Sequence, residues 1–339
     1  MSKELIIPIF IPHFGCKHLC VFCNQRKISG QNSLPKCEEI SEQVISYRNS
    51  CRNLAAREVQ LAYYGGSFTG ISPTEQEKFL AAAYELKQKG LIDKIRLSTR
   101  CDYLDETVLS RLKKYTVDII ELGVQSMDDE VLRLSGRGHT AEQVRESARL
   151  LKTEGFILGL QMMIALPGDT PQKTFYTAEE IVKLKPDFVR IYPTAIIKDT
   201  DLAVMWQNGE YKEWEWELLL DTTAQAAEIF MQASIPIIRI GLQAADNLSP
   251  ERDLLGGGYH PALGELVKGR IMRRRMECIL TGNPRNQAYD VYGNEKQLSQ
   301  IKGQKNVNVR YFAEKYQQRL YINPDRELVW DQLIIKPRL

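Results

Sequence analysis

The sequence lacks the features of a secreted or membrane-inserted protein. Residues 1–12 contain neither a basic stretch ahead of a long apolar run nor a small-residue cleavage site, so no secretory signal is expected. No window approaches the roughly 20 consecutive apolar residues of a membrane-spanning helix. We therefore expect a cytoplasmic protein with no membrane partner, in a compartment that keeps thiols reduced.

The sequence also has too few paired cysteines for a disulfide scaffold and too little net charge for a broad nucleic-acid surface. The number of cysteines, seven, is odd, and four of them are scattered, namely Cys37, Cys51, Cys101 and Cys278. The net charge is only +2. One local basic run, RIMRRR at residues 270–275, is a candidate RNA contact, with a solvated helix face as the alternative.

Short apolar runs alternate with long amphipathic segments over most of the chain. The expected strands are residues 5–11, 59–64, 95–99, 118–125, 156–164, 188–196 and 236–243, and the expected helices are residues 73–89, 105–115, 140–154 and 174–184. Ser72 and Asp105 are the expected N-caps of the first two helices. Strands that alternate with helices of this length predict right-handed βαβ units and a parallel sheet. The pattern indicates an α/β fold with a full or partial barrel, in which functional groups gather at the carboxyl ends of the strands.

The pattern changes near residue 265, and we expect two domains. Residues 1–264 would form the barrel and residues 265–339 a small C-terminal α+β extension. The extension begins with a basic helix at 265–280 and continues with β-like runs at 307–312, 319–323 and 327–335. The tripeptide Asn323-Pro324-Asp325 predicts a hairpin turn between the last two runs.

Three cysteines crowd the loop after the first expected strand, in the stretch FGCKHLCVFCNQ. Cys16, Cys20 and Cys23 could lie on one helix face as buried core thiols, although their polar neighbours would make a poor core. Zinc is a second alternative, with His13 or His18 as a fourth ligand, but no second ligand pair is present. An iron–sulfur cluster can leave one iron without a protein ligand, and three cysteines in one loop favour it over zinc.

The spacing Cys-x3-Cys-x2-Cys, with Phe22 before the last cysteine, resembles the signature of radical S-adenosylmethionine (SAM) enzymes. The resemblance extends to about residue 264 and implies a partial (β/α)6 barrel of the TIM type. Gly65-Gly66-Ser67 looks like the family's GGE motif, with serine where glutamate is commonest. The stretches ELGVQS (121–126) and GRGHT (136–140) are similar to motifs of oxygen-independent coproporphyrinogen oxidases and of the Elongator catalytic subunit.

The resemblance also implies cofactors and the residues that hold them. Cys16, Cys20 and Cys23 would bind a [4Fe–4S] cluster. The residues implied to bind S-adenosylmethionine are Phe22, Gly65, Gly66, Ser67, Ser98, Arg100, Gln125, Arg137, Gln161 and Met162. One electron from a reductant such as flavodoxin or ferredoxin would cleave the cofactor's C–S bond, and the resulting 5′-deoxyadenosyl radical would abstract hydrogen from the substrate.

Polar residues near the expected strand ends predict a substrate that forms hydrogen bonds. The candidate substrate-binding residues are Tyr63, Tyr64, Tyr192, Arg239, Gln243 and His260. Asp102, His260 and Arg239 are candidates for catalysis, the first two as proton donors or acceptors. The alternative for Asp102 is a helix cap, and for His260 it is a role in holding the glycine-rich loop. Arg239 lies within an apolar strand and needs a partner, which a substrate or a carboxylate could supply.

The motifs YYGGSFTG, STRCDY and RIGLQ resemble the Elongator catalytic branch most. The chain shows no acetyltransferase domain after the barrel and no long basic segment before it, and Cys101 stands where the branch has proline. With a net charge of only +2, we expect a small substrate, a modified nucleobase or nucleoside, cleaved by a queuine-type lyase of base salvage. The alternatives are a radical enzyme that modifies intact tRNA and a non-catalytic cluster or zinc protein.

The cluster assignment is tested with the variant Cys20→Ala. The anaerobically reconstituted wild type should show a thiolate-to-iron absorption band and should release 5′-deoxyadenosine when a reductant and S-adenosylmethionine are added. The variant should lose both properties. A Cys20→Ala protein that kept both would contradict the assignment.

Overall fold

A computed structural model of the chain describes residues 4–11, 16, 20–24, 33–243, 252–329 and 332–338. The chain divides into two compact units, one of residues 1–214 and 229–259 and the other of residues 215–228 and 260–339. Helix α9 (Trp216–Gln232) contributes residues to both units. The boundary expected at residue 264 stays a prediction.

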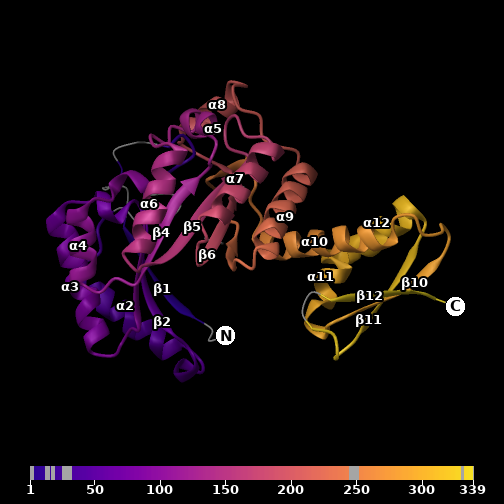
Figure 1. Cartoon of the computed structure of the whole chain (residues 1–339), viewed down its shortest axis with the longest axis horizontal. Coiled ribbons are helices and arrows are strands. Elements are labelled where there is room, and N and C mark those ends of the chain that lie inside the picture. The colour runs from indigo at the N-terminus through magenta and orange to yellow at the C-terminus, as the bar shows by residue number, and fades with distance from the viewer. Residues whose placement is uncertain are drawn as a thin grey trace. The chain divides into compact units, whose positions relative to one another are not determined.

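The first unit contains a seven-stranded sheet in the order β1-β2-β3-β4-β5-β6-β8, with every neighbouring pair parallel. Its strands are β1 (Leu5–Ile11), β2 (Val59–Gly65), β3 (Lys94–Thr99), β4 (Ile119–Gln125), β5 (Ile157–Ile164), β6 (Phe188–Pro193) and β8 (Ile237–Ile240). The strands β1 and β8 form its two edges. The predicted α/β fold with a partial barrel is confirmed (Figure 1).

The helices of this unit follow the strands as expected. They are α2 (Cys37–Ser50), α3 (Pro73–Gln88), α4 (Glu106–Lys114), α5 (Asp129–Leu134), α6 (Ala141–Thr153), α7 (Pro171–Lys183) and α8 (Asp201–Gln207). The predicted caps are present, because Ser72 accepts from the N–H of Glu75 at 3.3 Å and Asp105 accepts from the N–H of Val108 at 2.8 Å. The helices α3, α4, α6 and α7 lie against one side of the sheet (Figure 1).

Alternation along the strands separates a helix-covered face from an inner face. Tyr63 belongs to the covered face, where its ring stacks on Phe68 and its hydroxyl donates to the carbonyl of Phe79 at 2.7 Å. Tyr64, the next residue, bonds instead to Glu121 of β4 at 2.9 Å, on the inner face. Register therefore decides which strand residues can reach a site inside the partial barrel.

The expected strand at 188–196 divides into two. β6 ends at Pro193, which has no N–H for further ladder pairing, and the chain continues as β7 (Ala195–Ile197). β7 pairs antiparallel with β9 (Leu254–Gly257) in a separate two-stranded sheet. A β-carbon at Gly257 would lie 2.5 Å from the carbonyl oxygen of Thr194, so this close approach requires glycine.

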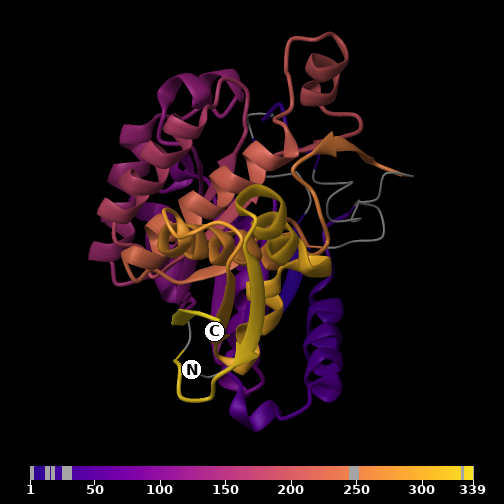
Figure 2. The same cartoon turned by 90° about the vertical axis from the view of Figure 1, so that its right-hand side faces the viewer.

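The second unit packs helices on one side of a three-stranded sheet (Figure 1; Figure 2). Its elements are α10 (Leu263–Leu280), α11 (Leu298–Lys302), α12 (Val307–Tyr316), β10 (Ala288–Gly293), β11 (Arg319–Pro324) and β12 (Leu333–Pro337). The buried core comprises Met272, Met276, Leu280, Tyr289, Val291, Ile301, Phe312 and Leu320. No helix among the described residues of either unit is long and apolar enough to span a bilayer.

Two expectations for this region were wrong, and one strand was not expected. Residues 307–312 are helical, because Asn308 anchors the first turn to the carbonyls of Gly269 and Ile301 at 2.9 and 3.1 Å and Phe312 packs four residues later on the same face. Strand β10 was missed. The strands β11 and β12 do not form a hairpin, since both pair with β10, which lies between them.

The glycine at the carboxyl end of β2 should be more sensitive to substitution than an exposed glycine of similar conformation. Gly65 has φ +105° and a β-carbon there would lie 2.4 Å from the carbonyl oxygen of Ile11, whereas Gly90 has φ +66° and nothing within 4 Å. Gly90→Ala should cost about 1–2 kcal/mol of unfolding free energy from the positive φ alone. Gly65→Ala should cost about 3 kcal/mol or more, because overpacking adds to the strain.

Equilibrium denaturation of both variants measures the two costs. Equal losses of stability in Gly65→Ala and Gly90→Ala would contradict the proposed contact with Ile11.

Candidate functional site

The described part of the cysteine loop is a turn held by two other segments. The N–H of Cys23 donates to the carbonyl of Cys20 at 3.0 Å. Val21 donates to the carbonyl of Ser135 at 3.1 Å and accepts from the N–H of Leu202 at 2.8 Å. Residues 20–24 are therefore not helical. Cys20 and Cys23 do not lie on one helix face, which was the alternative to a ligand-binding loop. Residues 12–15 and 17–19, with His13 and His18, lie outside the described residues.

Phe22 and Cys16 have separate environments on either side of this turn. Phe22 packs against the apolar cluster around Ile196, Leu202 and Tyr211. The thiol of Cys16 donates to the hydroxyl of Ser67 at 3.5 Å. Among the described residues, no three His, Cys, Asp or Glu side chains lie within reach of one metal ion. The joint ligation by Cys16, Cys20 and Cys23 stays a prediction.

Two buried guanidinium groups reach the sulfur of Cys20. Nη1 of Arg137 donates to Sγ at 3.4 Å, and Nη1 of Arg100 lies 3.9 Å from the same atom. Arg137 and Arg100 are 6% and 1% exposed. Positive charge beside a thiol stabilises the thiolate, which is the form that binds metal.

The two arginines differ in how their charge is balanced. Arg100 binds Asp102 through two hydrogen bonds, Nε to Oδ1 at 2.8 Å and Nη2 to Oδ2 at 3.0 Å. Burial alone would lower the pKa of Arg100, but the carboxylate of Asp102 outweighs it and raises the pKa. Arg137 makes no ion pair with any described residue, and its buried Nε has no hydrogen-bond partner among them. Arg137 therefore needs an anion that the described side chains do not supply.

Local structure fixes the position of Arg137. After α5 the N–H of Gly136 donates to the carbonyl of Arg133 at 3.1 Å, and the N–H of Arg137 donates to that of Leu132 at 2.9 Å. This is a Schellman motif with Gly136 at φ +63°. Arg137 then donates to the carbonyl of Gly123 on β4. A β-carbon at Gly123 would lie 2.6 Å from Nη2 of Arg137, so glycine makes this approach possible.

The carboxyl ends of β4 and β5 bring two further predicted cofactor residues together. Nε2 of Gln161 donates to Oε1 of Gln125 at 3.2 Å. The pairing register shifts between Gly123 and Gln125, and Gln125 has φ +70°, a conformation that is uncommon for a residue other than glycine. Met162 is fully buried and, by alternation, lies on the opposite face of β5 from Gln161.

The remaining predicted cofactor residues line the ends of β2 and β3. The N–H of Gly66 donates to the carbonyl of Ile11 at 2.8 Å, which holds the turn Gly65–Gly66 against β1. Ser67 is 5% exposed and faces Cys16 as described above. The hydroxyl of Ser98 donates to the carbonyl of Tyr63 at 3.4 Å. The structure thus brings Ser67, Arg100, Gln125, Arg137 and Gln161 to the same edge of the sheet as the cysteine loop.

The inner face carries a charged network that was not predicted from the sequence. The carboxylate of Glu121 on β4 accepts a hydrogen bond from Nη1 of Arg96 at 3.1 Å and forms an ion pair with Nε of Arg190 at 2.6 Å. The hydroxyl of Tyr64 donates to Glu121 at 2.9 Å and accepts from Nη2 of Arg190 at 2.6 Å. Burial, with the carboxylate of Glu121 beside it, raises the pKa of Tyr64. The sequence signal used for Arg239 was a charged residue inside an apolar strand. The same signal is present at Arg96, Glu121 and Arg190 and would have predicted them.

The predicted substrate residues lie in four different places. Tyr64, Tyr192 and Arg239 belong to the inner-face strands, and the hydroxyl of Tyr192 accepts from Nη1 of Arg190 at 3.1 Å. Tyr63 packs on the opposite, helix-covered face, so the structure does not place it with them. Gln243 is exposed beyond β8. His260 belongs to the second unit, where its Nδ1 accepts from the N–H of Ala262 at 3.0 Å.

The proposed proton-transfer roles of Asp102 and His260 stay predictions. Asp102 does not cap α4, since Asp105 does, and its carboxylate is engaged by Arg100. A third titratable group, His139, was not anticipated. It is 5% exposed, its Nε2 lies 3.3 Å from the carbonyl of Val124, and the thiol of Cys101 is 4.0 Å away. Burial raises the pKa of Cys101 to about 12, so this thiol is protonated.

The residues present fit the cofactors that the sequence resemblance implies. Arg137 has an orphaned buried donor and no carboxylate partner among the described residues. A carboxylate-bearing ligand or a thiolate-bound cluster at Cys20 would supply the missing negative charge. Glycine at positions 65 and 123 lets the backbone of Ile11 and the side chain of Arg137 pack closely at this edge. This edge of the sheet can therefore hold a zwitterionic ligand next to a thiolate-bound cluster.

Comparisons with known proteins identify relatives of this fold and site. The family profile of the Radical SAM superfamily matches residues 10–181, and that of the Radical SAM C-terminal domain matches residues 186–273. The archaeal Elp3 of Methanocaldococcus infernus, solved without its residues 1–46, shares the fold with a TM-score of 0.61 at 21% identity, over 82% of this chain and 66% of that one.

Curated relatives match part of the chain in sequence. The tRNA uridine(34) acetyltransferase of Methanocaldococcus jannaschii is 31% identical over 185 residues, which cover 54% of this chain and 33% of the relative. Elongator complex protein 3 of Danio rerio is 35% identical over 188 residues, with the same two coverages of 54% and 33%. The chain spans about a third of the length of these relatives.

The buried imidazole predicts a pH dependence of stability. Burial, with the positive charges of Arg137 and Arg100 nearby, lowers the pKa of His139 from 6.5 to about 3. Between these values the unfolded chain binds a proton that the folded chain does not. The free energy of unfolding therefore falls as the pH is lowered through this window, by up to roughly 1.4 kcal/mol per pH unit.

The variant His139→Gln isolates this contribution. Urea denaturation of the cluster-free protein from about pH 8 to about pH 5 should show the wild type losing stability relative to the variant as the pH falls. Burial raises the pKa of Asp169 to about 6, which acts in the opposite direction, but both proteins share it. A stability difference that stays constant over this range would contradict a neutral buried His139.

Proposed function

The chain belongs to the radical SAM superfamily, and from that premise we propose that it is a radical SAM enzyme that acts on a uridine-type nucleotide of intact tRNA. The family's cofactors are a [4Fe–4S] cluster and S-adenosylmethionine. The observation that carries the proposal is the sequence match to a relative whose name, tRNA uridine(34) acetyltransferase, places its substrate in tRNA. This supports the tRNA alternative over the free nucleobase and the queuine-type lyase expected from net charge.

The basic run at 270–275 is not the tRNA contact that the sequence suggested. Arg270 and Arg273 are 5% and 7% exposed, and Arg270 pairs with Asp221 and Glu217 of α9 at 2.5 Å each. Arg274 pairs with Glu228 at 2.9 Å. The run is therefore neither a free patch nor the solvated helix face that was the alternative. It holds α10 to α9.

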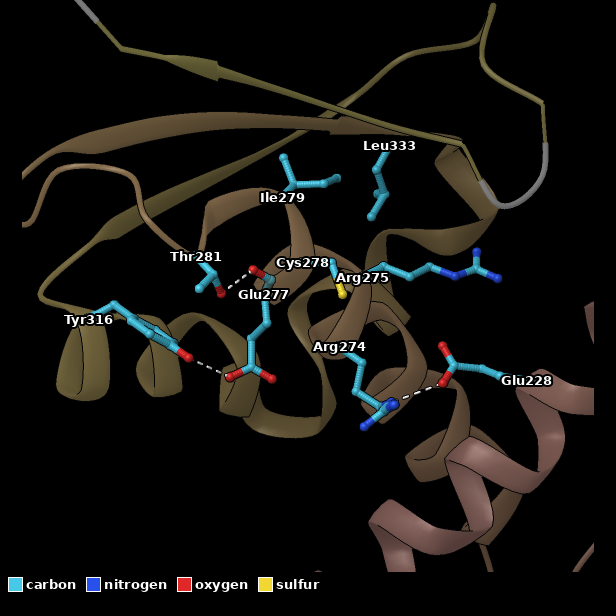
Figure 3. Close-up of a pocket in the computed structure, with 9 residues that line it drawn as sticks. All are labelled: Glu228, Arg274, Arg275, Glu277, Cys278, Ile279, Thr281, Tyr316 and Leu333. Atoms are coloured by element: carbon cyan, nitrogen blue, oxygen red, sulfur yellow. Dashed lines mark hydrogen bonds and ion pairs between the residues drawn. The ribbon is translucent and has the colours of Figure 1, made fainter. Parts of the chain in front are cut away.

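The cavity beside this run has a balanced lining. The cavity has a volume of about 640 Å³. Figure 3 shows that, among its lining residues, Arg274 contacts Glu228 and the hydroxyl of Tyr316 contacts Glu277. Two arginines and two glutamates contribute to its lining. Since its basic side chains are matched by acidic ones, this cavity gives no support to phosphate binding.

The low net charge of the chain conceals a basic C-terminal region. Residues 260–339 hold 15 of the 45 Lys and Arg residues but only 8 of the 43 Asp and Glu residues. Residues 215–228 of the same unit add four acidic and no basic residues, so the unit as a whole has an excess of three positive charges. A positive excess on one unit favours a nucleic-acid contact there, which the total of +2 does not reveal.

Part of this charge lies on the open side of the three-stranded sheet. Tyr289, Val291 and Leu320 face the helices, so the alternate residues of the strands face solvent. This open face carries Tyr292, Arg319, Tyr321, Lys336 and Arg338, with Asp290 between them. The guanidinium of Arg338 lies 3.8 Å from the ring centre of Tyr321, and Nζ of Lys336 lies 5.8 Å from that of Tyr292. Aromatic rings among cations suit unstacked RNA bases and their phosphates.

The first unit supplies the groups for chemistry. Its Arg137 would hold an anionic group beside Cys20, and Asp102 keeps Arg100 oriented next to them. The bound cluster and S-adenosylmethionine would supply radical chemistry able to remove hydrogen from a C–H bond. The inner-face residues Tyr64 and Tyr192 would bind the substrate nucleotide by hydrogen bonds.

Substrate competition tests the proposal. With reconstituted enzyme, S-adenosylmethionine and reductant, unmodified tRNA should stimulate release of 5′-deoxyadenosine above the substrate-free rate, whereas uridine and free modified bases should not. Binding to tRNA should weaken steeply as salt rises. Stimulation by a free base or nucleoside but not by tRNA would overturn the proposal in favour of base salvage.

A matched pair of lysine variants locates the tRNA surface in the same assay. Lys336→Ala on the open sheet face should weaken tRNA binding and reduce the salt slope by about 1. Lys183→Ala on α7, whose ammonium pairs with Glu180 at 2.5 Å, should leave both unchanged. Equal behaviour of the two variants would remove this face from the proposal.

A further inference from the structure

Among the described residues, the inner face of the sheet carries three arginines and one glutamate, on the strands β3, β4 and β6 and on the edge strand β8. Arg96 belongs to β3, Arg190 to β6 and Arg239 to β8, while Glu121 belongs to β4. Arg96 is 1% exposed and Glu121 5%. Charges removed from water in this way are stable only when each has a counter-charge or enough hydrogen-bond partners.

The single carboxylate is already fully used. Glu121 accepts from Arg96 at 3.1 Å and from Tyr64 at 2.9 Å, and it pairs with Arg190 at 2.6 Å. Arg96 also lies 3.9 Å from the carboxylate of Glu4, which is 41% exposed. The carboxylate of Glu121 therefore has no free acceptor position for a third guanidinium.

Arg239 is the one of these three arginines that does not pair with Glu121. It is half-buried, and its Nε donates to the carbonyl of Gly241 at 3.0 Å. Its two terminal nitrogens make no hydrogen bond or ion pair with any residue that the structure describes. Arg239 pairs in register with Arg190 on the neighbouring strand, and like charges directly opposite each other destabilise a sheet. An anion bound between them would remove that penalty.

The arginine pair lies level with the predicted cofactor residues. Gly123, Gln161, Arg190 and Arg239 are register partners across β4, β5, β6 and β8. Neighbouring strands are about 4.8 Å apart, so Arg239 is roughly 10 Å from Gln161 along this level. A substrate group held at Arg239 would therefore lie beside the predicted cofactor residues, within the length of one nucleotide.

The surroundings hold Arg190 in place for such a ligand. Its Nη1 donates to Tyr192 at 3.1 Å and its Nη2 to Tyr64 at 2.6 Å. On the same face, the guanidinium of Arg96 stacks on Phe188 at 4.9 Å. A β-carbon at the facing Gly159 would lie 2.3 Å from the Phe188 ring, so glycine makes room for it. The network is thus preorganised around Arg190, and Arg239 keeps unused donors.

We propose that Arg239, with Arg190 beside it, forms an anion-binding site on the inner face of the sheet that holds a phosphate or carboxylate group of the substrate. Arg239 makes the direct contact through its two terminal nitrogens, which match two oxygens of such a group. Arg190 adds positive charge, and Glu121 with Tyr64 positions it. The proposal deepens the proposed function, on which it rests for the identity of the substrate as a nucleotide.

Binding measurements on the reconstituted holoenzyme with S-adenosylmethionine present test the site. The probes are uridine 5′-monophosphate, uridine and sodium acetate, and the readout is the dissociation constant from calorimetry. A charge-assisted hydrogen bond contributes about 1.5–3 kcal/mol, so removing this contact should weaken anion binding about 10- to 100-fold.

Three variants are compared with the wild type, one that removes the contact and two that serve as controls. Arg239→Gln removes the charge on an edge strand and should keep the fold, which thermal unfolding and unchanged affinity for S-adenosylmethionine verify. Arg239→Lys keeps the charge without the two-pronged geometry and should bind with intermediate affinity. Arg326→Gln, at an 83% exposed side chain paired with Glu295 in the second unit, should bind like the wild type.

The outcomes separate the two sources of the anion. Tighter binding of the monophosphate than of uridine, lost in Arg239→Gln, would support a phosphate of the substrate. Acetate binding lost in Arg239→Gln, without a preference for the monophosphate, would support a carboxylate. Equal affinities of the wild type and Arg239→Gln for both anions would overturn the site. Activity on tRNA is measured separately, so failure of the proposed function and failure of this site are distinguishable.

Discussion

Parallel pairing from β1 to β8 is the constraint on which the rest of the first unit depends. Because all seven strands run in one direction, their carboxyl ends meet at one edge, and loops far apart in sequence converge there. Arg137 shows the consequence: it follows α5, yet it reaches the sulfur of Cys20 and the carbonyl of Gly123. The same pairing sets the second constraint, alternation, which sends Tyr63 to the helices and Tyr64 to the inner face.

Most buried charges in this unit have a counter-charge nearby. The few that have none among the described residues indicate where an anionic ligand would bind. Arg100 has Asp102, and Arg96 and Arg190 share Glu121. Arg137 and Arg239 have no carboxylate among the described residues. Since an unpaired guanidinium is costly away from water, these two positions are where ligands with negative charge would stabilise the fold. One lies at Cys20, and the other lies level with Gln161 on the inner face.

The C-terminal unit shows how a whole-chain property can mislead. A net charge of +2 led to the expectation of a small substrate, although residues 260–339 hold 15 basic and 8 acidic residues. The most conspicuous basic run, 270–275, then proved to be bound to acidic residues of α9. Cations on the open sheet face, such as Lys336 of β12 and Arg338 directly after that strand, are separated in sequence by only one residue, but the pairing of β12 was not foreseen. Strand register decides which side chains share a face, and so it decides which charged residues form a surface patch.

The sequence by itself determined the alternating strands and helices, the caps at Ser72 and Asp105, and the cysteine loop with its glycine motifs, because these depend on local spacing and on residue type. It did not determine helix α12, where Asn308 and Phe312 gain their partners from α10 and α11. Nor did it reveal the Arg96–Glu121–Arg190 network, whose members come from three strands and meet only through register. Tertiary structure decided which charges face one another, since pairing and alternation set those distances and local composition does not.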